Sequence, residues 1–117
     1  MDRNLQLLGI ARKAGLLAIG AESVSASARA GSAKAVITAE DASDGAKRRA
    51  QRDAAFCGAA YVATHYSKFE LGSITGRGAP GTLAVMDTGL AEGFVNGLAD
   101  KPPGGTDKTI GKRRAAK

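Results

Sequence analysis

The chain has few of the residues that mark several common functional classes. Its 117 residues include one cysteine, one histidine, three phenylalanines and two tyrosines, and no tryptophan. A single cysteine, Cys57, excludes an internal disulfide and any metal site built from several cysteines. The scarcity of aromatic side chains leaves few candidates for a surface on which nucleic-acid bases stack.

Long apolar runs are also missing. No stretch approaches the length of a membrane span, and the first residues lack the apolar core of a secretion signal. We therefore expect no membrane partner and a cytoplasmic protein. Hydrophobic residues make up 44% of the chain, which is enough for one globular domain with an ordinary core. We expect this domain to be a monomer.

Positive charge is concentrated at one end of the chain. The formal net charge is +6, yet residues 101–117 hold six Lys or Arg residues against one Asp, so residues 1–100 are nearly neutral. Low hydrophobicity and one charge sign after the Pro102-Pro103-Gly104-Gly105 segment predict a disordered basic tail. We expect a domain over residues 1–100 and a tail over residues 101–117, whose Lys112, Arg113 and Arg114 attract polyanions.

Helices are expected to alternate with short apolar strands along the domain. The expected helices lie between Asp2 and Gly15, over 22–30, from a cap at Ser43 or Asp44 to Cys57, over 68–74 and over 90–98. The expected strands cover residues 16–19, 34–39, 60–63 and 82–86. Because these strands are continuously apolar, we expect a sheet covered on both faces, which is an α/β/α sandwich.

The third expected helix has two different faces. Its inward positions are Ala46, Ala50, Ala54 and Cys57, so Cys57 is expected to be a small buried hydrophobe. Its outward positions are Lys47, Arg48, Arg49 and Arg52. A cationic face of this kind is either simply solvated or contacts phosphate, and the pattern leaves both interpretations open.

The sequence offers no convincing catalytic or cofactor motif. Gly76, Gly78 and Gly81 match the dinucleotide-binding spacing, but a helix precedes them and a strand follows, which is the reverse of the fingerprint. His65 is the only histidine and has no evident oriented acid or nucleophile. We therefore expect a protein that is not an enzyme and holds neither a cofactor nor a metal.

Three other positions are candidates for ligand contact. Gly20 precedes a helix, where a glycine lets a ligand approach the free backbone N–H groups or simply makes a tight turn. Glu40-Asp41 follows a strand and either caps the next helix, accepts from a base amino group, binds a divalent ion or does acid/base work. Lys13 ends the first helix, where it contacts phosphate or complements the negative end of the helix.

A series of segments resembles one family. In order they are Leu8-Gly9-Ile10-Ala11-Arg12-Lys13-Ala14-Gly15, Gly20-Ala21-Glu22-Ser23, Gly31, Ala35-Val36-Ile37-Thr38-Ala39-Glu40-Asp41-Ala42 and Ser67-Lys68-Phe69-Glu70-Leu71-Gly72. Over residues 4–88 the chain is similar to the ribosomal protein seven-Ae/thirty-e superfamily of kink-turn RNA binders, and particularly to its small bacterial YlxQ-like branch. The resemblance implies an α/β/α sandwich with a mixed four-stranded sheet.

The resemblance also implies where RNA binds. The segment Gly20–Ser23 would contact the sheared G·A pairs of a kink-turn stem, and residues 63–71 would hold its extruded nucleotide. Strong binders of the family carry Asn, Glu and Lys at the positions of Glu22, Ser23 and Ala26. An ionised Glu22 only accepts hydrogen bonds, and Ala26 cannot neutralise a phosphate, so we expect weakened or altered kink-turn recognition.

The expected partner is therefore RNA, ribosomal or otherwise structured, with the ribosome and translation or transcription factors as further candidates. The alternative is a protein-interaction or accessory module on the same scaffold with little specific RNA binding. The residues expected at the RNA surface are Lys13, Gly20, Ala21, Glu22, Ser23, Glu40, Lys68, Leu71, Lys112, Arg113 and Arg114.

Overall fold

The computed structural model describes residues 3–76 and 78–99, without the side chains of residues 98 and 99. The expected cap at Asp2, the inward position of Leu98 and the basic tail with Lys112, Arg113 and Arg114 lie outside what is described. The elements in chain order are α1 (Arg3–Lys13), β1 (Leu17–Ile19), α2 (Ala21–Arg29), β2 (Ala35–Thr38), α3 (Asp44–Cys57), β3 (Ala60–Ala63), α4 (Lys68–Thr75), β4 (Thr82–Val85) and α5 (Thr88–Ala99).

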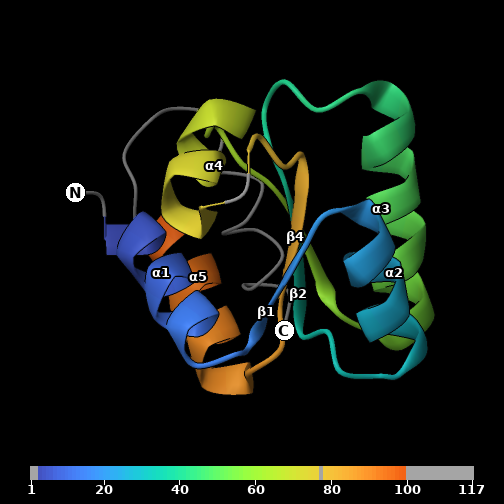
Figure 1. Cartoon of the computed structure of the whole chain (residues 1–117). Coiled ribbons are helices and arrows are strands. Elements are labelled where there is room, and N and C mark those ends of the chain that lie inside the picture. The colour runs from blue at the N-terminus through green and yellow to red at the C-terminus, as the bar shows by residue number, and fades with distance from the viewer. Residues whose placement is uncertain (1–2, 77, 100–117) are drawn as a thin grey trace.

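The four strands form one mixed sheet in the order β1-β4-β2-β3. Strand β4 pairs antiparallel with both β1 and β2, and β2 pairs parallel with β3. Helices α2 and α3 cover one face of the sheet, and α1, α4 and α5 cover the other (Figure 1). The α/β/α sandwich with a mixed four-stranded sheet is thus confirmed.

The core has two halves because neighbouring strand residues point to opposite faces of a sheet. Every residue of β2 and β4 is buried. On the side of α1, α4 and α5, Ile37 and Leu83 pack with Phe94. On the side of α2 and α3, Val36 packs with Ala50, and small side chains there let the helices lie close to the sheet.

One expectation about exposure was wrong. Strand β3 is not covered along its whole length, since both Ala60 and Ala63 are exposed. Strand β3 is an edge strand, with a neighbour on one side only, so its apolar sequence did not imply full burial. Ile10 of α1 is a large hydrophobic side chain that is 53% exposed. Among the described helices, none is both long and apolar enough to cross a membrane.

Candidate functional site

The segments that precede α2, α3 and α4 meet at one edge of the sheet. Strands β1, β2 and β3 end at this edge and β4 begins there, because β4 runs antiparallel to β1 and β2. The N–H of Gly20 donates to the Thr82 carbonyl at 2.9 Å, and the N–H of Ala39 donates to the Gly81 carbonyl at 2.9 Å. The start of β4 therefore links the turn into α2 to the loop into α3, and three helix N-termini share the edge (Figure 1).

Two of these N-termini are closed by the chain's own side chains. Ser43 Oγ accepts from the Ala46 N–H at 3.1 Å and caps α3. At α4, Ser67 Oγ accepts from the Glu70 N–H at 3.0 Å, while the Glu70 carboxylate accepts from the Ser67 N–H at 2.8 Å. This reciprocal capping box satisfies backbone donors that would otherwise lack a partner within the helix.

The N-terminus of α2 is different. Its cap residue is Gly20, with φ 96° and ψ 155°, and no side chain of the described residues caps it. The first bond of the helix runs from the Val24 N–H to the Gly20 carbonyl, so the N–H groups of Ala21, Glu22 and Ser23 precede the helical ladder. The Glu22 and Ser23 side chains are exposed, which leaves this helix end accessible.

The two residues of the acidic pair after β2, Glu40 and Asp41, make different contacts. Asp41 Oδ1 accepts from the N–H of Lys68 at 2.8 Å, so it fixes the start of α4. Of the roles left open for this pair, capping of the following helix belongs instead to Ser43, which caps α3. The Glu40 side chain is exposed, and its carbonyl accepts from Lys47 Nζ at 3.0 Å. The pair thus joins two loops, and the exposed Glu40 carboxylate lies at the edge.

The structure brings only part of the expected surface together. Gly20, Ala21, Glu22, Ser23, Glu40 and Lys68 lie at this edge, which we call the α2 edge. Leu71 is 0% exposed and supports the preceding loop from within the core. Lys13 lies before the start of β1, separated from Gly20 by the length of that strand, in a groove beside Ser73 and Ile74.

Arg49, which was expected on the outward face of its helix, lies against α2 instead. Arg49 Nε donates to Ser25 Oγ at 3.0 Å, and Ser25 Oγ donates to Asp53 Oδ2 at 2.6 Å. The Arg49 Nη2 atom lies 3.7 Å from Glu22 Oε1. The sequence indicates this position of Arg49 and Asp53. Each lies three residues after an inward alanine, Ala46 or Ala50, and residues three apart are neighbours on a helix surface.

The other side chains of α3 lie closer to their expected exposure. Arg48 and Arg52 are exposed, and Lys47 is half-buried. Cys57 is half-buried beside the second half of the core, with its thiol donating to the Asp53 carbonyl at 3.4 Å. It is therefore less enclosed than the predicted small buried hydrophobe.

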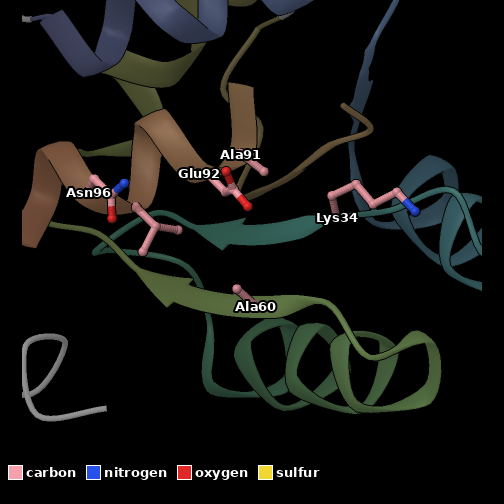
Figure 2. A pocket seen from close by; sticks show the side chains of 6 residues that line it. Lys34, Ala60, Ala91, Glu92 and Asn96 are labelled. Atoms are coloured by element: carbon pink, nitrogen blue, oxygen red, sulfur yellow. The ribbon is translucent and has the colours of Figure 1, made fainter. Parts of the chain in front are cut away.

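A cavity of about 200 Å³ lies at the opposite edge of the sheet, where β2 and β3 begin. Its lining comprises Lys34, Ala60, Ala91, Glu92, Val95 and Asn96. The Lys34 side chain extends away from the Glu92 carboxylate (Figure 2), so the two ionisable groups do not converge on one point. The cavity is smaller than the roughly 300–1,000 Å³ of common ligand pockets. No group of three or more metal-ligating side chains occurs within residues 3–76 and 78–99.

The chain shares its fold with a protein of known structure. The chain resembles a protein of unknown function from Bacillus halodurans, with a TM-score of 0.75 and 23% sequence identity over 83% of this chain and 97% of that one. At this identity the likeness shows the shared fold alone. No family model and no curated protein matches the chain.

Proposed function

We propose that the chain is a non-catalytic RNA-binding protein for structured RNA, ribosomal or similar to a kink-turn, and that the α2 edge is its contact surface. The observation that carries this proposal is the contrast among the three N-termini. The starts of α3 and α4 are capped by serine side chains, whereas α2 begins at a glycine without such a cap. An open helix N-terminus favours phosphate groups and other anions.

The charges around the N-terminus of α2 both attract and repel RNA phosphate. Lys68 begins α4 beside Gly81, at the start of β4, and brings a cation to the edge. Glu22 and Glu40 bring exposed carboxylates to the same edge, which repel phosphate. Ala26, one turn further along α2, is exposed and supplies no charge. This balance supports weakened or altered kink-turn recognition, as the resemblance to kink-turn binders implies.

The test compares binding to a kink-turn RNA with binding to a plain duplex of equal length, each over a range of salt concentrations. A preference for the kink-turn that survives at high salt supports recognition of RNA shape at the α2 edge. Equal binding to both RNAs with a steep salt dependence would mean that phosphate attraction alone holds the RNA. Such a result would overturn the proposed specific recognition.

A matched pair of lysines tests where the RNA lies. Lys68→Ala removes a charge from the α2 edge, whereas Lys34→Ala removes the same charge from the opposite edge of the sheet. We expect Lys68→Ala to weaken kink-turn binding and to lower its salt slope by about 0.9, the change for one phosphate contact. Lys34→Ala is expected to change neither. Equal effects of both variants would contradict the assignment of the surface.

A gain-of-function variant complements this loss. Glu22→Asn, Ser23→Glu and Ala26→Lys together restore the pattern of strong kink-turn binders at side chains that are all exposed. We expect the triple variant to bind the kink-turn RNA more tightly than the original chain. Unchanged affinity would mean that the RNA-binding face lies elsewhere.

One observation favours a second function, a protein-interaction module. A groove of about 450 Å³ runs between α1 and α4, with the exposed Ile10 in its lining and Arg12 and Lys13 beside it. An apolar groove next to cations suits an acidic protein segment. A protein partner that stays bound at high salt, together with no kink-turn preference, would favour this function.

A further inference from the structure

Helices α2 and α3 contact each other through a set of polar side chains. Helix α2 presents Glu22 and Ser25, one turn apart, toward α3, which presents Arg49 and Asp53. The pair of helices lies on one face of the sheet (Figure 1). Small side chains, including Ala28 and Ala50, are buried there, and they permit the close approach that these polar contacts require.

The Arg49 guanidinium is held in place from one side. Its Nε–H donates to Ser25 Oγ at 3.0 Å, and Ser25 is itself buried and donates to Asp53 at 2.6 Å. Because the Ser25 hydroxyl hydrogen points to Asp53, the oxygen lone pairs of Ser25 are directed toward Arg49. The orientation of the guanidinium is therefore fixed before any ligand arrives, which reduces the entropy lost on binding.

The other side of the guanidinium faces the Glu22 carboxylate without a hydrogen bond to it. Its Nη2 lies 3.7 Å from a Glu22 carboxylate oxygen, which is longer than a hydrogen bond. The Glu22 side chain is 90% exposed and that of Arg49 is 36% exposed. Exposed ion pairs of this kind contribute little stability, so a stronger anion can displace Glu22 at small cost.

We propose that Arg49 is a phosphate-binding residue of the α2 edge, that Ser25 and Asp53 position it, and that Glu22 competes with RNA for its guanidinium. The inference rests on the proposed RNA-binding function and names a residue that determines its strength. A guanidinium offers a planar pair of donors that suits phosphate oxygens. Arg49 thus brings from α3 a cation that Ala26 does not supply from α2.

The experiment measures RNA affinity over a salt series for Arg49→Ala and, as its control, for Arg48→Ala. Arg48 carries the same charge on the same helix but is exposed. We expect Arg49→Ala to weaken binding about tenfold and to lower the salt slope by about 0.9, the values for one lost phosphate contact. We expect Arg48→Ala to weaken binding about twofold or less at physiological salt, where distant charges are screened.

The variant Glu22→Gln separates phosphate binding from a merely structural contact. If Glu22 competes with RNA, its neutralisation releases Arg49 and strengthens RNA binding about threefold, a gain of the size expected from one exposed ion pair. An exposed Glu22 carboxylate also repels phosphate directly, so the effect of Glu22→Gln is measured again in the Arg49→Ala background. If Arg49 only braces α2 against α3, Glu22→Gln raises affinity by the same factor with and without Arg49. Thermal unfolding of each variant shows whether an altered affinity reflects loss of the fold.

The outcomes distinguish this inference from the proposed function. Two results overturn the role of Arg49 and leave RNA binding by the original chain standing. One is equal effects of Arg49→Ala and Arg48→Ala, and the other is a Glu22→Gln gain that is absent or that persists unchanged in the Arg49→Ala background. Absence of RNA binding by the original chain overturns both the inference and the proposed function. A selective loss in Arg49→Ala, with a gain in Glu22→Gln that is lost in the Arg49→Ala background, supports the inference.

Discussion

The backbone at Gly20 permits a prediction of both sign and size. Its φ of 96° and ψ of 155° lie in a region that is essentially restricted to glycine, where another residue costs about 1–3 kcal/mol. A Cβ added at Gly20 would meet nothing within 4 Å, so the whole cost comes from the backbone. We therefore expect Gly20→Ala to lower the free energy of unfolding by about 1–3 kcal/mol.

The matched control is Gly45→Ala. Gly45 is exposed in the first turn of α3, and a Cβ there would also meet nothing within 4 Å. Its conformation is helical, so alanine is expected to raise the free energy of unfolding by about 0.4–1 kcal/mol by reducing the entropy of the unfolded chain. The same chemical change thus has opposite signs at two open positions.

Urea unfolding followed by circular dichroism measures both variants against the original chain. A single domain of this size is expected to unfold in one cooperative step, and equal slopes against urea would show that the unfolded states are comparable. If Gly20→Ala proves as stable as Gly45→Ala, the argument from backbone conformation at Gly20 is refuted.

Three further changes have defined expectations. Ser67→Ala removes the capping box of α4 and is expected to lower the free energy of unfolding by about 1 kcal/mol, measured in urea, with Ser73→Ala as the control in the same helix. Phe94→Ala empties a site that is 0% exposed and is expected to cost about 3–5 kcal/mol; a loss below 1 kcal/mol would contradict the tight packing of α5. Removing residues 102–117 is expected to weaken binding to all RNAs alike and to flatten the salt dependence, and a loss selective for one RNA would contradict this.

Local patterns in the sequence predicted most of the fold. Apolar runs bounded by glycines placed each strand within two residues of its observed ends, and Ser43 was one of the two caps expected for α3. These features are encoded within a few consecutive residues, by capping hydroxyls and by glycines that end helices. The layers of the sandwich followed because apolar strands alternated with helices.

Contacts between distant segments could not be predicted in the same way. Asp41 supports α4 rather than α3, and Arg49 contacts Ser25 and Glu22 rather than solvent alone. Both outcomes depend on which helices the fold brings side by side, and hydrophobic periodicity does not encode this. The exposure of β3 likewise depends on its place at the edge of the sheet.

The central place of β4 has a consequence for the order in which the molecule can assemble. Strand β4 comes last in the chain among the four strands, yet it supplies every antiparallel pairing of the sheet. Leu17 of β1 must find Val85, so β1 has no strand partner until β4 has been synthesised. A nascent chain that ends before Thr82 can form only the parallel β2–β3 pair. Closure of the sheet therefore awaits a contact of long sequence separation, which favours slow folding late in translation.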